Sequence, residues 1–229
     1  MKTVGLIGGT TWVSTQAYYR LINEITNKRL GGLNASKCLI HSFNFDEIAR
    51  LQRNNETGLM YKKIENAAIN LIKSGALGIA LCANTMHIYA NQLSHKLSVP
   101  VIHIAEATAK KIIKAGISEV GLLGTRYTME MKFYTDILEK QGISVHIPPS
   151  SEIEFIHECI FSELAKDIFK EQSRNRFLKI IEQLKSEGAK GIILGCTEIP
   201  LLIQQNHTNM PLFDTLEIHA NAIVDFALV

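Results

Sequence analysis

The feature that most constrains the fold is an internal repeat. VGLIGGT from Val4 corresponds to VGLLGTR from Val120, and LGIALCANTMH corresponds to KGIILGCTEIP. A third pair of segments, VPVIHIAEATAKKII and MPLFDTLEIHANAIV, follows in the same order. The separation is 78 positions from Val4 to Cys82 and 76 from Val120 to Cys196. Three landmarks in one order at nearly one spacing predict two structural units of the same kind.

The repeating unit is an alternation of strand and helix. Short apolar runs such as GIALCAN are followed by stretches of helical period such as RFLKIIEQLKSEG. This order indicates parallel sheets covered by helices on both faces. We expect an α/β protein of two similar domains related by a pseudo-twofold axis, with the active site in the cleft between them. A helix around 105–115 is the expected crossover, so the first domain takes residues 1–104 and 210–229, and the second takes 105–209.

Composition excludes several classes of partner. The chain has 229 residues, 24 of them basic and 22 acidic, without a lysine or arginine block. Nothing therefore indicates a nucleic acid or an anionic membrane as partner. No apolar run is long enough to span a bilayer, and the N-terminus lacks a secretory signal. We expect a soluble, cytoplasmic protein.

The four cysteines fall into two groups. Their spacing matches no zinc site, so no metal is expected, and disulfides are uncommon in a cytosolic chain. Cys38 and Cys159 are interpreted as small buried apolar residues. Cys82 and Cys196 occupy corresponding positions in the two repeats, each at the end of an apolar strand and the expected start of a helix. A helix N-terminus lowers the pKa of a thiol, which makes these two the candidate reactive groups.

Four strand ends carry small polar residues. Ligands of an open parallel sheet bind beyond the carboxyl ends of its strands. The segments there combine backbone N–H groups with hydroxyl or amide donors, which suits a carboxylate or a phosphate. They are Gly8-Gly9-Thr10-Thr11, Cys82-Ala83-Asn84-Thr85, Gly124-Thr125-Arg126-Tyr127-Thr128 and Gly195-Cys196-Thr197-Glu198. None is a phosphate loop or a dinucleotide fingerprint, so we predict no nucleotide cofactor. Thr125, in the third of these segments, is taken as a substrate-binding candidate.

Two thiols on opposite sides of one cleft suit the inversion of a stereocentre. One thiolate removes a proton from one face, and the opposite thiol returns a proton to the other face. An aldolase or a hydrolase would gain nothing from this pair. The alternative reading is two symmetric core cysteines left by the duplication.

The motifs resemble those of the aspartate/glutamate racemase family over essentially the whole chain. The similarity rests on both cysteine motifs and on segments that include Gly8-Gly9, Trp12, Tyr18-Tyr19-Arg20, His41-Ser42 and Phe213-Asp214-Thr215. The resemblance implies inversion of a small amino acid, aspartate and/or glutamate, without pyridoxal phosphate or any other cofactor. It implies that Cys82 and Cys196 are the acid/base pair, and it makes a homodimer the expected assembly.

The resemblance also implies roles for neighbouring residues. It implies that Asn84, Thr85 and Thr197 bind substrate or orient the thiols, and that Thr10 and Gln52 line the site. Many relatives read Gly-Gly-Met-Ser-Trp-Glu-Ser-Thr in the first loop, where this chain has Thr10 and Val13 at the third and sixth positions. These two changes bear on substrate preference.

Three further residues are candidates with open alternatives. Glu198 either tunes Cys196 or stabilises a helix start. Lys166 either binds a substrate carboxylate or is solvated. His87, three residues after Asn84, is a candidate for a supporting role.

Rival functions remain at this point. They are a hydantoin racemase, a maleate isomerase or a decarboxylase on the same scaffold, and a non-catalytic protein that binds a dicarboxylate.

Overall fold

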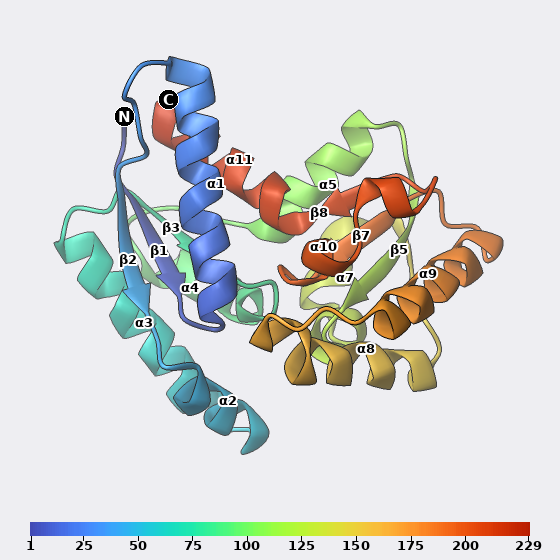
Figure 1. Ribbon diagram of the computed structural model, residues 1–229. Coiled ribbons are helices and arrows are strands. Elements are labelled where there is room, and N and C mark those ends of the chain that lie inside the picture. Colours follow the sequence, from blue (N-terminus) through green and yellow to red (C-terminus); the bar gives the residue numbers. More distant parts are fainter. The chain divides into compact units, whose positions relative to one another are not determined.

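The computed structural model describes all residues, 1–229, and divides into two compact units. Unit 1 comprises Met1–His103 and His219–Val229, and unit 2 comprises Ile104–Ile218. Each unit holds one four-stranded parallel sheet with helices beside it (Figure 1). The expected class, two similar α/β domains with parallel sheets, is confirmed.

The sheet of unit 1 has the order β2-β1-β3-β4. Its strands are β1 (Val4–Gly8), β2 (Cys38–Ser42), β3 (Gly78–Leu81) and β4 (Val101–Ile102). Strands β1 and β3 are buried along their whole length, as expected for inner strands of a parallel sheet. The helical elements are α1 (Trp12–Leu30), α2 (Phe45–Arg53), α3 (Thr57–Lys73), η1 (Thr85–Tyr89), α4 (Ala90–Lys96) and α11 (Thr215–Leu228).

The sheet of unit 2 has the matching order β6-β5-β7-β8. Its strands are β5 (Glu119–Gly124), β6 (Ser144–His146), β7 (Ile192–Gly195) and β8 (Leu212–Asp214). The helical elements are α5 (Ile104–Lys114), α6 (Arg126–Glu130), α7 (Lys132–Glu139), α8 (Ser150–Ser162), η2 (Leu164–Lys166), α9 (Glu171–Ser186), α10 (Ile199–Leu202) and η3 (Gln205–His207). The equal strand order in both sheets is the structural form of the sequence repeat.

The return of the chain to unit 1 lies later than the sequence predicted. Strand β8 pairs in parallel with β7, with Phe213 opposite Ile193. Residues 210–218 therefore belong to unit 2, and the chain enters unit 1 at His219 rather than at residue 210.

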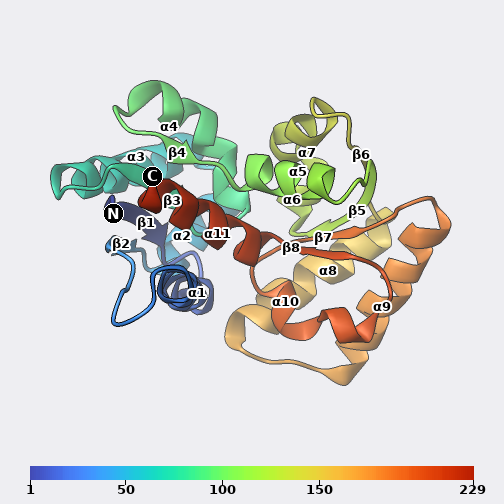
Figure 2. The same ribbon diagram turned by 90° about the horizontal axis from the view of Figure 1, so that it is seen from above.

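The two units exchange a helix. Helix α5 follows β4 of unit 1 but lies in unit 2, while α11 begins after β8 of unit 2 and its larger part lies in unit 1. Figure 2 shows the red end of α11 beside β3, where Phe226 covers Gly78. One buried tyrosine contacts each exchanged helix. The Tyr18 hydroxyl lies 2.8 Å from His219 Nδ1, and the Tyr134 hydroxyl donates to Thr108 Oγ1 at 3.3 Å.

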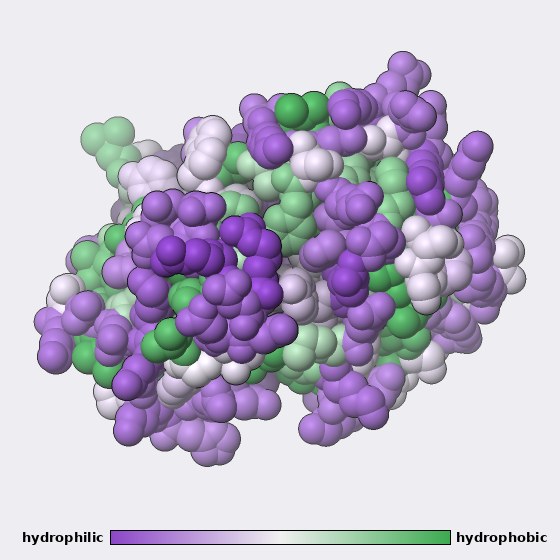
Figure 3. Space-filling view, turned by 90° about the horizontal axis from the view of Figure 1, so that it is seen from below, coloured by the Kyte–Doolittle hydropathy of each residue, from purple (hydrophilic) through white to green (hydrophobic).

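No helix combines the length and the apolar character that crossing a bilayer requires. On the face drawn in Figure 3 hydrophilic side chains predominate, with hydrophobic ones scattered among them.

Candidate functional site

Each cysteine directly follows the second inner strand of its sheet. Cys82 comes after β3, and its N–H donates to the Ile7 carbonyl at 2.9 Å. Cys196 comes after β7 in the same way. Both thiols are buried and neither forms a disulfide. The duplicated positions predicted from sequence are therefore equivalent positions at the carboxyl ends of two sheets.

The turn after β1 is built around Gly9. Its φ is +75°, and a Cβ there would lie 2.2 Å from the backbone nitrogen of Phe43. The Gly9 N–H donates to Thr15 Oγ1 at 2.8 Å, and Thr11 caps α1 by accepting from the Ser14 N–H. Thr10, between these anchors, is 8% exposed, and its hydroxyl makes no hydrogen bond in the protein. A buried hydroxyl of this kind is suited to receive a ligand.

Side chains hold the turn that carries Cys82. Ser14 Oγ donates to the Cys82 carbonyl at 2.8 Å. His87 Nδ1 lies 3.0 Å from the Ala83 carbonyl, which makes Nδ1 the protonated ring nitrogen. Asn84 and Thr85 continue this turn into η1, and Asn84 is buried. Ser14 was not among the predicted site residues.

His87 belongs to a cluster of three buried histidines. Its ring centroid lies 4.8 Å from that of His103 and 5.4 Å from that of His219. Burial, followed by the two neighbouring rings, holds the pKa of His87 well below its usual range. Burial lowers the pKa of His103 and of His219 to about 4. The cluster is therefore neutral at physiological pH.

The tautomer of His219 follows from its partners. Its Nε2 lies 2.7 Å from the Ile102 carbonyl, which only an N–H can approach in this way. Nδ1 then accepts a hydrogen bond from the Tyr18 hydroxyl. His219 thus joins α1 and α11 to the end of β4.

The second cysteine has a carboxylate as its partner. Cys196 Sγ donates to Glu198 Oε2 at 3.0 Å, and Thr197 Oγ1 donates to the same oxygen at 2.8 Å. Glu198 is 3% exposed. Of the two readings of Glu198, contact with the Cys196 thiol is the one that these distances favour.

The pKa values of both thiols lie above the ordinary range for cysteine, which favours the protonated form. Burial raises the pKa of Cys82, and burial together with the Glu198 carboxylate raises the pKa of Cys196. The lowered thiol pKa values expected from the sequence are therefore wrong. A five-residue 3₁₀ segment follows the Cys82 motif, and a four-residue helix follows the Cys196 motif. Segments this short have a weak dipole, so they stabilise a thiolate less than its burial destabilises it.

The turn after β5 is shaped by hydroxyls. Thr125 caps α6 by accepting from the Thr128 N–H, and the two hydroxyls lie 3.1 Å apart. The guanidinium of Arg126 is paired with Glu154. Thr125 is thus placed at the carboxyl end of β5, in the same unit as Cys196 and Thr197.

Two predicted residues lie on other elements than these turns. Gln52 is half-buried in α2, and Lys166 is exposed in η2, as its solvated alternative predicted. Neither side chain is joined to a cysteine motif by a hydrogen bond or an ion pair.

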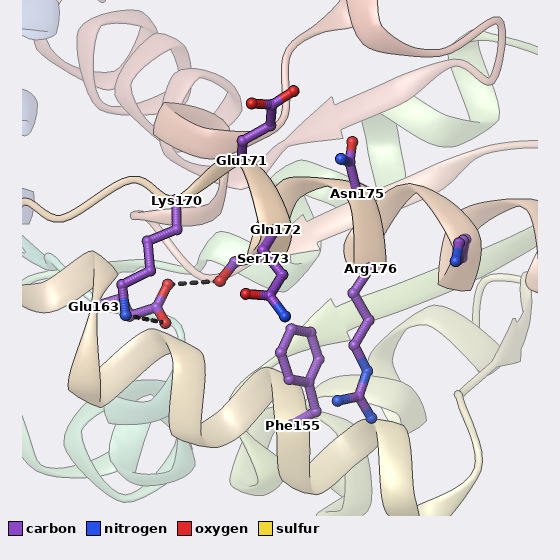
Figure 4. Close-up of a pocket in the computed structure, with 9 residues that line it drawn as sticks. Phe155, Glu163, Lys170, Glu171, Gln172, Ser173, Asn175 and Arg176 are labelled. Carbon is purple, nitrogen blue, oxygen red and sulfur yellow. Dashed lines mark hydrogen bonds and ion pairs between the residues drawn. The ribbon is translucent and has the colours of Figure 1, made fainter.

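A hollow of about 670 Å³ lies between α8 and α9 in unit 2 (Figure 4). None of the predicted site residues lines it. Glu163 accepts from Lys170 and Ser173 there, and Arg176 lies over the Phe155 ring and pairs with Glu152. Its main charged groups are thus already engaged.

The sequence matches the family described as Asp/Glu/hydantoin racemase over residues 7–223, nearly the whole chain. The chain belongs to this family. Membership makes the protein an isomerase of the racemase class and confirms the resemblance seen in the motifs. The fold agrees: a candidate Asp/Glu racemase from Yersinia pestis is 43% identical over the full length of both chains, with a TM-score of 0.93.

Two further relatives of this racemase-family protein are informative. An aspartate racemase homologue from Pyrococcus horikoshii is 36% identical over both full chains, with a TM-score of 0.86. A broad-specificity amino-acid racemase from Bacillus subtilis is 28% identical over 156 residues, which cover 68% of this chain and 67% of the relative.

Proposed function

We propose that the protein is a cofactor-independent amino-acid racemase in which Cys82 and Cys196 exchange the α-proton, with aspartate and/or glutamate as substrates. The observation that carries the proposal is the equivalence of the two cysteines. Each thiol is buried and directly follows the second inner strand of one of two like sheets. Inversion needs one group on each face of a planar carbanion, and a duplicated unit with one thiol in each copy supplies two.

In the proposed mechanism both thiols carry their protons before the substrate reacts. Cys196 gives its proton to Glu198, whose oxygen already accepts from Sγ at 3.0 Å. The α-ammonium group of the substrate offsets the charge of the thiolate that forms. The thiolate takes the α-proton and becomes a thiol. Cys82 gives its own proton to the opposite face, which yields the mirror image and leaves Cys82 as the thiolate.

The α-carboxylate carries the charge that develops as the proton leaves. We assign its binding to amides and hydroxyls of the strand-end turns, with Thr10, Asn84, Thr85, Thr125 and Thr197 as the residues involved. Preorganised donors of this type contribute roughly 3 kcal/mol each when water is excluded. The buried Thr10 hydroxyl, which has no hydrogen-bond partner in the protein, supports this assignment.

The chemistry of these donors bears on which amino acids the site accepts. The proposed binding residues are uncharged, and Arg126 is paired with Glu154. A substrate side chain would thus meet hydroxyls and amides rather than an unpaired cation. The test panel must therefore extend beyond the acidic amino acids. The homodimer and the cytoplasmic location remain predictions.

The first experiment is proton NMR in D₂O with single enantiomers of the protein amino acids and no added cofactor. We expect loss of the α-proton signal together with formation of the other enantiomer. Hydantoins and maleate in the same panel cover the rival substrates. Ligand binding without any exchange would instead indicate a dicarboxylate-binding protein.

The two-base assignment is tested by a pair of variants. Cys82→Ser and Cys196→Ser each leave one thiol, which can remove and return a proton on one face only. We expect Cys82→Ser, which keeps the Cys196–Glu198 pair, to exchange the α-proton of one enantiomer without inversion. Cys196→Ser, whose Cys82 has no carboxylate beside it, should exchange that of the other enantiomer more slowly. Cys159→Ser is the control and should behave as the parent protein. Inversion at the parental rate by either single variant would contradict the mechanism.

A further inference from the structure

Two buried side chains hold consecutive carbonyls of the turn that carries Cys82. Ser14 Oγ donates to the Cys82 carbonyl at 2.8 Å, and His87 Nδ1 donates to the Ala83 carbonyl at 3.0 Å. Ser14 and His87 are each 2% exposed. Ser14 reaches this turn from the first turn of α1, so the contact joins two strand ends of the sheet.

The geometry of the peptide group extends the effect to the following amides. In a planar trans peptide the C=O of one residue and the N–H of the next point in opposite directions. A fixed Cys82 carbonyl therefore sets the direction of the Ala83 N–H, and a fixed Ala83 carbonyl sets that of the Asn84 N–H. Successive oriented N–H groups form the kind of concavity that binds a carboxylate.

The ring of His87 is itself held in place. The His103 and His219 rings pack against it, and His219 is fixed by Tyr18 and by the Ile102 carbonyl. The Ala83 and Ile102 carbonyls both favour a proton on the His87 ring, and Nδ1 is the nitrogen that lies 3.0 Å from the Ala83 carbonyl. A donor at the Nδ1 position and a donor at the Nε2 position should therefore act differently on the turn that carries Cys82.

The turn that carries Cys196 is held differently. The Cys196 carbonyl accepts from the Ile199 N–H at 3.2 Å, a backbone bond. In the sequence repeat, Glu130 and Leu201 stand opposite Ser14 and His87, and both are exposed. The first half of the repeat thus has side-chain supports for its backbone, while the second has Glu198 on the thiol itself.

We propose that Ser14 and His87 are positioning residues of the racemase, which orient the Cys82 thiol and the two following amides toward the substrate carboxylate. The inference rests on the proposed function for its consequence in catalysis. The two hydrogen bonds that fix the Cys82 and Ala83 carbonyls lie wholly within unit 1.

The test uses two substitutions of His87 that differ in where they place an amide N–H group. In His87→Asn the side-chain nitrogen falls near the position of Nδ1, and in His87→Gln it falls near that of Nε2. We expect kcat/KM of His87→Gln to fall about tenfold to a hundredfold, and His87→Asn to keep most of the parental value. Ser14→Ala should fall like His87→Gln, and Ser14→Thr should recover part of the loss.

Thr108→Ala is the control for stability. Thr108 Oγ1 also donates to a backbone carbonyl from a fully buried position, that of Ile104 at 2.8 Å. Its removal should lower the midpoint of urea unfolding by about as much as Ser14→Ala does, and leave kcat/KM unchanged. Equal losses of activity in His87→Asn and His87→Gln, or losses that follow stability in all variants, would overturn the proposal.

A second measurement needs no substrate. The ¹H–¹⁵N resonances of Ala83 and Asn84 should shift in His87→Gln and in Ser14→Ala, and stay near their parental positions in His87→Asn. Unchanged resonances in every variant would refute the positioning role even in an active enzyme. An inactive parent protein with the expected shifts would instead refute the proposed function and leave the held geometry standing.

Discussion

At the residue scale, the two cysteines differ in the group beside them. Glu198 accepts from the Cys196 thiol and from Thr197 in an almost dry environment. In the repeat, Asn84 stands opposite Glu198, so the turn of Cys82 has an amide where the turn of Cys196 has a carboxylate. The proposed mechanism therefore has one thiol with its own proton acceptor and one without.

We predict that Glu198→Gln lowers kcat/KM roughly a hundredfold, because an amide cannot take the Cys196 proton. The decrease in kcat/KM must be the same for conversion of the L-enantiomer and of the D-enantiomer. An amino acid and its mirror image have equal free energy in water, so the two values of kcat/KM are tied together. Only kcat and KM taken separately can differ between enantiomers. Circular dichroism of each enantiomer during turnover measures all four constants.

Glu163→Gln is the matched control for this prediction. Glu163 also accepts from a thiol and a hydroxyl, those of Cys159 at 3.6 Å and Ser173 at 2.7 Å, but it lies at the end of α8. It should leave turnover unchanged. Comparable losses in both variants would show that the effect is one of folding and not of proton transfer.

The residues that sequence alone could predict are those whose partners are close in the chain or in the repeat. Cys82 and Cys196 were identified by their equivalent positions, and the contact of Glu198 with Cys196 spans two residues. The Ser14 contact spans 68 residues and depends on how α1 packs beside β3. Its only signal in the sequence was a serine in the first turn of a helix after a glycine turn. The thiol pKa values could not be predicted, because burial outweighs the short helical segments.

At the element scale, the turn between β1 and α1 is the most constrained piece of backbone. Gly9 combines a positive φ with backbone atoms of Phe43 where a side chain would start. Gly31, at the other end of α1, also has a positive φ, but a Cβ there would meet nothing within 4 Å. One helix is thus bounded by two glycines that are required for different reasons.

We predict that Gly9→Ala lowers the free energy of unfolding by at least about 3 kcal/mol, from backbone strain plus the clash with Phe43. Gly31→Ala carries the strain alone and should cost about 1 to 2 kcal/mol. Urea denaturation of both variants measures the difference. Similar losses in the two would mean that the turn relaxes around the new methyl group.

The strands could be predicted well because each is an apolar run bounded by turn residues. All eight correspond to such runs, from VGLIGG to MPLFDT. The boundary of the units could not be predicted, because no linker composition marks it and the partner of β8 is set by the sheet. The segments after the cysteines were also misjudged: they read as helix starts, but only short turns form.

At the scale of the whole molecule, three neutral histidines buried in unit 1 make stability depend on pH. In the unfolded chain their pKa is about 6.5. In the folded protein the pKa of His103 and of His219 is about 4, and that of His87 is well below its usual range. Between these limits the unfolded chain binds more protons, so the free energy of unfolding falls as the pH falls.

One carboxyl group acts in the opposite sense. Burial raises the pKa of Asp214 to about 6, against an ordinary value of 3.8. Between these two values the folded protein holds a proton that the unfolded chain has released. The stabilisation that comes from this difference is therefore lost as the pH rises through the folded-state pKa of Asp214. For these four groups the net difference is about two protons near pH 5, and the lowered pKa of His157 adds to it in the same sense.

We therefore predict that the free energy of unfolding changes little between about pH 7 and pH 8 and falls by about 2 to 3 kcal/mol per pH unit near pH 5. Urea titrations at closely spaced pH values measure the slope. His219→Gln keeps an N–H group for the Ile102 carbonyl but does not titrate, and should reduce the slope by about one proton. A slope unchanged by this substitution would exclude His219 from the linkage.

The exchange of α5 and α11 bears on the ancestry of the chain. A polypeptide of half this length and the same topology would send its last helix away from its own sheet. It would fold only as an intertwined pair, each copy closed by the other. Fusion of two such genes gives the order of elements seen here, with Tyr18 and Tyr134 still contacting the exchanged helices. When the two halves of the chain are expressed separately, neither should therefore fold unless the other is present.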